Sequence, residues 1–480
     1  MRDLIDLCLN TASVLGASYT DIRIVHNERE SITHKNGKVE DISVSSDSGF
    51  GVRMLVNGAW GFASSFKLEH LEIEEITALA FKIAKASALA KKGDVTLAPA
   101  KPIQDRYKTN LVLDPFKVPL EKKLELLSAA EGIMRKNQGV KISQASMDSF
   151  KKEQIFANSE GSYIEQEITF CGAGIMAMAI RNGDVQKRSY PNSFRGQFAT
   201  KGYEFIESLG LKENAERIAE EAVALLSAKE CPNTTTTLIL DGSQLALQIH
   251  ESVGHAIELD RILGMEASFA GTSFLRPDHL RTYQYASPLV NITADATIEG
   301  ALGTFGYDDE GVKAQRIEIV KEGKLVGFLT SRETAAILGQ ESNGTMRADG
   351  WNRIPLIRMT NINLGPGDRS LDEIIAETKE GIFLQTTKSW SIDDKRLNFQ
   401  FATEIGWEIK NGKLKSMIKN ANYTGITPQF WSSCDAIANR DHWQVWGTPN
   451  CGKGEPMQVI SVGHGTSPAR FRNIRIGVGK

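Results

Sequence analysis

The run from His250 to His255, His-Glu-Ser-Val-Gly-His, places two imidazoles and one carboxylate within six residues. Histidine nitrogens are common zinc ligands, and a glutamate beside the ion can act as general base for a metal-activated water. This combination favours a metal-dependent hydrolase. The two histidines are five residues apart, however, whereas a spacing of four places both side chains on one face of an α-helix. On a straight helix, residues five apart point about 140° away from each other.

The spacing therefore predicts a distorted helix. A π-bulge, a kink or a helix break between His250 and His255 would let both imidazoles face one ion. Gly254 is a residue type that permits such a break. Over residues 243–259, one apolar stripe should pack on the domain, and the polar half should carry the motif; the stripe is formed by Leu245, Ile249, Val253 and Ile257.

Two acidic residues follow on that polar half. Glu258 or Asp260 could accept the second ring N–H of a ligating histidine and so select its tautomer. The six-residue run alone also fits an ordinary amphipathic helix whose polar half faces water. A third metal ligand is needed to decide between these interpretations.

Cys451 is the candidate for the third ligand. It lies in the glycine-rich segment 447–454, which is expected to be a flexible loop, and Lys453 and backbone N–H groups there could lower the pKa of the thiol. Five other histidines are expected at surface or capping positions: His26, His34, His70, His279 and His442. His26 and His34 lie in predicted hairpin strands, His70 begins a predicted helix, and the last two have no neighbouring ligand type. The remaining cysteines are expected to be small buried apolar residues: Cys8, Cys171, Cys231 and Cys434.

Composition excludes several classes of protein. With 480 residues, 41% of them hydrophobic and 24% charged, the chain is expected to form two or three ordinary globular domains. A net charge of −3 gives no electrostatic case for direct nucleic-acid binding. Neither a membrane span nor a secretory signal is expected, and the odd number of cysteines argues against a disulfide framework. These features predict a cytoplasmic protein.

The order of helical and strand-like patterns predicts an α+β fold with mostly antiparallel sheets. Residues 1–232 should form an N-terminal α+β domain with flanking helices. This domain divides further into two units, about 1–100 and 119–232, in each of which helices surround strands. Residues 233–480 should form a β-rich C-terminal domain that carries the metal site, with 446–470 as irregular loop.

Four separate blocks resemble the TldD subunit type of the TldD/TldE (PmbA) metalloprotease family. They cover residues 53–63, 250–260, 354–361 and 451–471, and they occur in the same order as in the family. The resemblance extends over nearly the whole chain. Because the zinc motif is intact, the chain resembles the catalytic TldD type and not the TldE type, which lacks it.

The resemblance implies a specific activity. His250, His255 and Cys451 would bind Zn²⁺, and Glu251 would be the catalytic base. Family members act on unfolded or short peptides, including leader or propeptide segments, held as an extended strand in a protected cavity between subunits. The implied partner is a homologous subunit, in a homodimer or in a heterodimer with a TldE-like chain.

Peptide hydrolysis also needs a donor for the oxyanion. His464, close in sequence to Cys451, is the candidate, and a structural hydrogen bond from a loop histidine is the alternative. Arg347 and Arg358 are candidates for substrate contact, although both could be surface or interface arginines.

Two rival functions remain on the residues alone. The chain could be a non-catalytic regulatory or scaffold partner with a vestigial site, but the intact set of histidines, glutamate and cysteine argues against that. It could also hold a structural zinc ion, but such sites use four protein ligands and no fourth is apparent.

Overall fold

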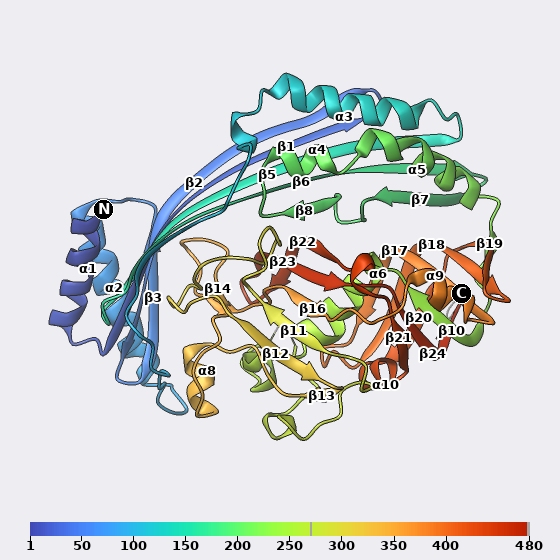
Figure 1. The fold of residues 1–480 in the computed structure, drawn as a ribbon. Coiled ribbons are helices and arrows are strands. Elements are labelled where there is room, and N and C mark those ends of the chain that lie inside the picture. The colour runs from blue at the N-terminus through green and yellow to red at the C-terminus, as the bar shows by residue number, and fades with distance from the viewer. Residues whose placement is uncertain (269–270, 478–480) are drawn as a thin grey trace.

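An arched, mostly antiparallel sheet dominates the first half of the chain. The computed structural model describes residues 1–268 and 271–477, and in Figure 1 the long strands of this sheet curve over the second half. Its four longest strands pair along most of their length: β1 (Tyr19–Lys35), β2 (Lys38–Val56), β5 (Val140–Asn158) and β6 (Tyr163–Arg181). β1 pairs with both β2 and β5, so the two segments expected as separate units share one sheet.

Shorter strands complete this sheet, in the order β3-β2-β1-β5-β6-β4, with β7 and β8 also paired to β6. Their bounds are β3 (Ala59–Ser65), β4 (Gln104–Lys108), β7 (Asp184–Tyr190) and β8 (Gln197–Ala199). Asn36-Gly37 and Asn57-Gly58 close the first two hairpins with positive φ, as their Asn-Gly sequences predict.

Helices cover the arch at its two ends and bury separate apolar clusters against it. One cluster lies under α1 (Arg2–Leu15) and α2 (His70–Ala88). The other lies under α3 (Leu120–Arg135), α4 (Tyr203–Ser208) and α5 (Leu211–Leu225). Among the described residues, no helix is both long and apolar enough to cross a membrane.

A closed five-stranded barrel forms the centre of the second half. Its strands follow the order β17-β10-β24-β20-β18, and β18 pairs back to β17. Their bounds are β10 (Thr234–Leu240), β17 (Glu380–Ile392), β18 (Asn398–Lys410), β20 (Asn422–Ile426) and β24 (Ala469–Ile476). Three short strands extend it: β9 (Lys229–Glu230), β19 (Lys413–Lys419) and β21 (Cys434–Ile437).

Smaller sheets and short helices surround the barrel. A four-stranded sheet contains β11 (Ile292–Asp295), β12 (Arg316–Lys321), β13 (Lys324–Leu325) and β16 (Ile362–Leu364). A two-stranded ladder pairs β14 (Met346–Arg347) with β15 (Leu356–Ile357). The helices are α6 (Gly242–Ile249), α7 (Leu259–Ile262), α8 (Arg332–Ile337), α9 (Leu371–Ala376) and α10 (Thr427–Ser432). The predicted α+β class and the β-rich second half are confirmed.

The segment 446–470 differs from its prediction as an irregular loop. It contains most of the hairpin of β22 (Gln444–Lys453) and β23 (Gln458–Thr466) and the start of β24. Because the segment is rich in glycine and polar residues, its sequence does not show a clear strand pattern. Part of the hairpin is buried: Cys451, Val462 and His464 face the interior of the second half, whereas most of β22 is partly or fully exposed.

Ion pairs, one group of them buried, join the arch to the second half. Arg53 of β2 contacts Asp21 of β1 at 2.7 Å and Glu310 at 3.3 Å, and all three side chains are at most 4% exposed. Arg332 of α8 contacts Glu160, which follows β5 and is 36% exposed, at 2.6 Å. Removing one partner of a buried pair such as Arg53 and Glu310 leaves an uncompensated charge in the interior.

We therefore expect Arg53→Met to lower the free energy of unfolding by about 3–5 kcal/mol, because Asp21 and Glu310 lose their shared cation. Urea unfolding measures the change. Arg106→Met is the matched control: Arg106 pairs with Glu165 on the surface, so its loss should cost at most about 1 kcal/mol. Equal effects of both substitutions would contradict a role for Arg53 in joining the two halves.

Candidate metal centre

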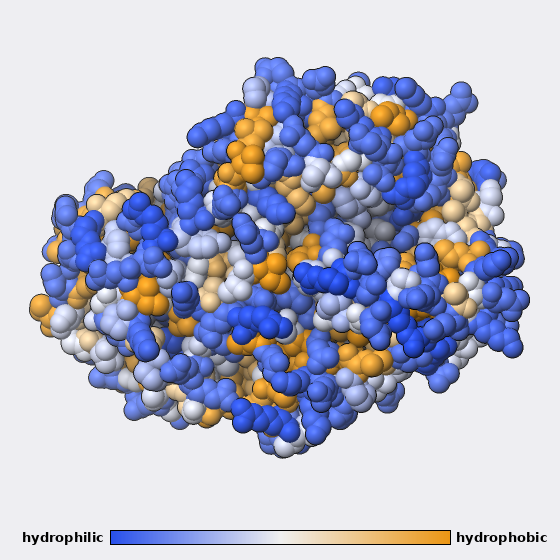
Figure 2. All heavy atoms as spheres, viewed as in Figure 1, coloured by the Kyte–Doolittle hydropathy of each residue, from blue (hydrophilic) through white to orange (hydrophobic). Residues whose placement is uncertain are grey.

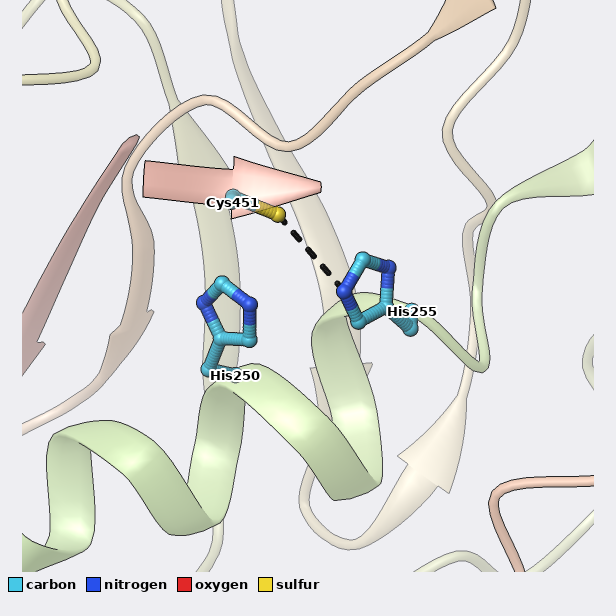
Figure 3. Close-up of side chains that lie close together, drawn as sticks. All are labelled: His250, His255 and Cys451. Atoms are coloured by element: carbon cyan, nitrogen blue, oxygen red, sulfur yellow. Dashed lines mark hydrogen bonds between the residues drawn. The ribbon is translucent and has the colours of Figure 1, made fainter. Parts of the chain in front are cut away.

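The segment that carries both histidines follows the central barrel strand β10. Asp241 caps α6 by accepting a hydrogen bond from the Gln244 backbone N–H at 3.0 Å. After Ile249 the α-helix gives way to a π-helical turn over His250–Gly254, and the His255 N–H donates to the His250 carbonyl at 3.2 Å. The expected distortion is thus present. Residues five apart are stacked in a π-turn, so both imidazoles project from the same side, toward Cys451 (Figure 3).

Gly254 belongs in this turn for a reason that the sequence did not reveal. Its φ is not in the left-handed region, so the turn does not depend on the conformational freedom of glycine. A Cβ at this position would instead lie 2.0 Å from the Met359 Sδ, and Met359 is fully buried. Glycine is required here because Met359 packs directly against the bare backbone.

We expect Gly254→Ala to displace the π-turn and reduce bound zinc, with a loss of about 1–3 kcal/mol of stability from overpacking. Elemental analysis and thermal unfolding measure the two effects. Gly132→Ala is the control, since Gly132 lies within α3 and an added Cβ there meets no atom within 4 Å. Gly132→Ala should be neutral or stabilising. Normal zinc content in Gly254→Ala would show that the turn tolerates a side chain.

His250, His255 and Cys451 form one compact, buried group. Their potential ligand atoms all lie within 4.8 Å of one another, and the His255 Nε2 is 3.6 Å from the Cys451 Sγ. In a tetrahedral zinc site with bonds of about 2.0–2.3 Å, ligand atoms are roughly 3.3–3.6 Å apart. The separation of His255 and Cys451 matches these values, and a donor set of two imidazoles and one thiolate suits Zn²⁺ and leaves a fourth position free.

Cys451 is held on a strand and not on a flexible loop as expected. Arg358 donates to its backbone carbonyl, and the side chain lies in the interior. Burial raises the pKa of the Cys451 thiol, but the neighbouring His255 and the Arg358 guanidinium outweigh it and leave the pKa below its usual value. Lys453, expected to help lower that pKa, instead contacts Asp260 at 2.8 Å and Glu258 at 3.3 Å.

Each imidazole of this group has a partner on its Nδ1 nitrogen. The His255 Nδ1 lies 3.1 Å from the Glu258 carboxylate, as proposed for Glu258 from the sequence. The His250 Nδ1 lies 2.7 Å from the His464 Nε2. Burial lowers the pKa of all three histidines, which favours the neutral imidazoles that metal binding requires.

Several candidate residues occupy places that the sequence did not predict. His464 is fully buried behind His250, which fits the structural alternative better than the oxyanion role. Asp260 accepts from Lys453 and not from a ligand histidine. Arg358 is fully buried, and Arg347 donates to the Met359 and Ser461 carbonyls. His34, expected at the surface, is buried beside Glu131.

A cavity of about 390 Å³, called the metal cavity below, opens onto His250, His255 and Cys451. Glu251 lines it and forms an ion pair with Arg396 at 2.6 Å. Its other walls come from α6, β22, the end of β17 and the segment between β7 and β8 of the arch. They include Phe194, Leu247, Trp390, Ser391, Ile392, Thr448, Asn450 and Gly452. Sequence reasoning missed Arg396, Trp390 and Phe194, because no motif marks them.

Comparisons with known proteins agree with this geometry. Models described as PmbA/TldA metallopeptidase domain 1, central domain and C-terminal domain match residues 20–90, 113–229 and 233–477. A metalloprotease of Methanocaldococcus jannaschii is 36% identical over 451 residues, which cover 93% of this chain and 94% of that protein. The chain belongs to the PmbA/TldD metallopeptidase family. The resemblance inferred from the four sequence blocks is thereby confirmed.

More distant members of the PmbA/TldD family extend the comparison. A zinc metalloprotease TldD homolog of Saccharolobus solfataricus is 24% identical over 472 residues, 98% of each chain. The solved structure of TldE from Thermococcus kodakarensis has a TM-score of 0.74 and 17% identity, and the match covers 99% of both chains. The second likeness shows that the fold is shared.

Loss of a residue that hydrogen-bonds to a metal ligand weakens metal binding by roughly 10–100-fold. We expect Cys451→Ser, which removes a proposed ligand itself, to weaken zinc binding by more than this. Serine keeps the size of the side chain but supplies a far poorer zinc donor. Competition with a fluorescent chelator measures the affinity. Cys231→Ser is the control, because Cys231 lies outside the cluster and should leave zinc affinity unchanged. Unaltered affinity in Cys451→Ser would remove Cys451 from the site.

Proposed function

We propose that this chain is a zinc-dependent peptidase that hydrolyses unfolded or short peptides, of the leader or propeptide type, with Glu251 as general base. The observation that carries the proposal is the convergence of His250, His255, Cys451 and Glu251 on one cavity. The name of the Saccharolobus solfataricus relative supports zinc as the metal. The donor set of two imidazoles and one thiolate suits the same ion.

The residues of the site divide the chemistry between them. His250, His255 and Cys451 would hold the ion, which when bound polarises the scissile carbonyl and lowers the pKa of a water molecule beside it. Glu251 accepts a proton from the attacking water and returns it to the leaving amine. Glu258 and His464 keep the two ligand imidazoles in place through their second nitrogens.

A second cavity supports an extended peptide as the substrate. It has a volume of about 710 Å³, lies between the arch and the second half, and includes Phe194 and Asn450, which also line the metal cavity. Its wall carries aromatic residues, among them Phe150, Phe170 and Phe305, beside charged ones. A chain of several residues could occupy both cavities, whereas a folded protein could not enter them.

A homologous subunit is the proposed partner, in a homodimer or in a heterodimer with a TldE-like chain, in the cytoplasm. The likeness of the whole fold to TldE of Thermococcus kodakarensis supports a related partner. On the face in Figure 2, apolar residues lie in small patches separated by hydrophilic ones. A partner is therefore expected on another face or across a polar interface.

The two rival functions fit the site less well. A structural zinc site would use four protein ligands, but the cluster in the described part of the chain supplies three. A vestigial site would not be expected to keep a buried carboxylate in an open cavity next to the ligands.

We expect Glu251→Gln to retain zinc and to lower kcat for an unstructured peptide by about 10²–10⁴-fold, because the amide cannot accept the proton from water. Release of a fluorescent fragment measures the rate, and elemental analysis measures zinc. Glu121→Gln, on the exposed side of α3, should leave both unchanged. Full activity in Glu251→Gln would remove Glu251 as the base.

Chelation separates the proposal from the structural alternative. Chelator should abolish cleavage by the wild-type chain while the protein stays folded, with a lowered unfolding midpoint, because a bound ion stabilises the native state by mass action but a large apolar core remains without it. Unfolding of the protein by chelator would favour a structural zinc site.

A further inference from the structure

The residues assigned a role in the proposed peptidase reaction include no hydrogen-bond donor for the carbonyl oxygen of the substrate. When water adds to the scissile carbonyl, negative charge develops on the carbonyl oxygen, and a donor placed at that oxygen lowers the barrier. His464 cannot supply it, because its ring is fully buried behind His250. Among the described residues that line the metal cavity, Arg396 is the one Lys or Arg side chain.

We propose that Arg396 is a catalytic residue that donates hydrogen bonds to the carbonyl oxygen as its negative charge develops. This inference rests on the proposed peptidase function and names a role within the same site. Four observations carry it: the turn that holds Arg396, its unused donors, its contact with Glu251, and the change in charge that the reaction brings about.

A rigid turn aims Arg396 into the cavity. The hairpin between β17 and β18 is closed by Asp393, whose carboxylate accepts from the backbone N–H groups of Leu397 at 2.8 Å and Asn398 at 3.1 Å. The Arg396 N–H donates to the Asp393 carbonyl, and the Thr427 hydroxyl donates to the Arg396 carbonyl. The backbone of Arg396 is thus held on both sides.

The conformation of this turn is unfavourable for an arginine. Arg396 has φ +61°, in the left-handed region where glycine or asparagine is preferred. Strain of this kind persists where the surrounding structure enforces it, and such residues cluster at functional sites. A glycine would close the hairpin at lower cost, so the closure of the turn does not account for a long cationic side chain.

Most N–H donors of the Arg396 guanidinium have no hydrogen-bond partner among the described residues. Its one hydrogen bond within the described residues runs from Nη1 to the Glu251 Oε2 at 2.6 Å. The buried Nε has no hydrogen-bond partner there. An arginine has five N–H donors, so the guanidinium can bind a second oxygen while it stays beside Glu251. Its side chain is 17% exposed and faces the cavity that the substrate must enter.

During the reaction, the negative charge near Arg396 moves from Glu251 to the carbonyl oxygen of the substrate. Before the attack, the Glu251 carboxylate is negative and the carbonyl oxygen is neutral. The water oxygen then forms a bond to the carbonyl carbon, the C=O π pair moves onto oxygen, and the water proton moves to Glu251. Glu251 becomes neutral as the carbonyl oxygen becomes negative.

Arg396 therefore loses its resting partner at the moment when a new anion appears within the same cavity. When the intermediate collapses, the pair returns to re-form the C=O bond, the C–N bond breaks, and the proton on Glu251 passes to the leaving amine. Arg396 then pairs with Glu251 again. Arg396 therefore interacts more strongly with the substrate in the transition state than in the ground state, which is the condition for catalysis.

The alternative is that Arg396 only positions Glu251 through their ion pair. The two roles are separated in a Glu251→Gln background, where the ion pair no longer exists. The probe is a phosphinic peptide, whose tetrahedral anion resembles the charged oxygen of the intermediate. Calorimetry on the zinc-loaded protein measures its affinity for Glu251→Gln alone and for Glu251→Gln combined with Arg396→Gln.

We expect the second substitution to weaken phosphinate binding by roughly 10²–10³-fold, the usual effect of losing one oxyanion donor. In the otherwise wild-type chain, Arg396→Gln should lower kcat by a similar factor with a much smaller change in KM. Arg396→Lys keeps the charge and should recover part of both losses. Zinc content and the unfolding midpoint, measured on every variant, identify any that has simply failed to fold.

Lys395→Gln is the matched control, because Lys395 lies on the same turn, is exposed, and carries the same charge. It should leave phosphinate affinity, kcat and KM unchanged. Equal phosphinate affinity with and without Arg396 in the Glu251→Gln background would overturn the catalytic role and leave Arg396 as a positioning residue. Failure of the zinc-loaded wild-type chain to bind the phosphinate or to cleave any peptide would instead overturn the proposed function.

Discussion

The site depends on one backbone hydrogen bond, from the His255 N–H to the His250 carbonyl. This bond spans five residues and closes a π-helical turn in a segment that begins as an α-helix. Without it the two imidazoles would diverge, and no third ligand could bring them to one ion. The turn also sends Glu251 into the cavity and sets Gly254 against Met359. Packing on both sides of the helix thus secures an otherwise uncommon geometry.

A buried polar network lies beside His255 and provides a partner for its Nδ1 nitrogen. The His255 Nδ1 lies against the Glu258 carboxylate, and Glu258 forms an ion pair with Lys453. Lys453 also pairs with Asp260 and donates to the Ile357 carbonyl. Charges are costly in the interior unless they are paired, so the residues of this network hold one another in place. Lys453 follows Cys451 by two residues on the same strand. The ion pairs of Lys453 therefore also fix the strand that carries the thiolate.

The arch contributes to the site from a distance. Its segment between β7 and β8 brings Phe194 to the metal cavity, where the ring packs edge-on against Trp390 of β17 at 5.7 Å between centroids. The ion pairs of Arg53 and Arg332 hold the arch onto the second half at the other end. The cavity is thus completed only when the two halves of the chain are assembled, which suits a peptidase that must exclude folded proteins.

By itself the sequence determined the donor chemistry, because the imidazoles, the carboxylate and the thiol are properties of the side chains. The five-residue spacing also required a distorted helix, since a straight one cannot point both histidines at one ion. Only the tertiary structure decided that Cys451 lies on a strand, that His464 lies behind His250, and that Arg396 faces Glu251. These contacts join segments 145 to 214 residues apart. Their formation depends on how the barrel, the hairpin and the arch pack, and no local pattern encodes that.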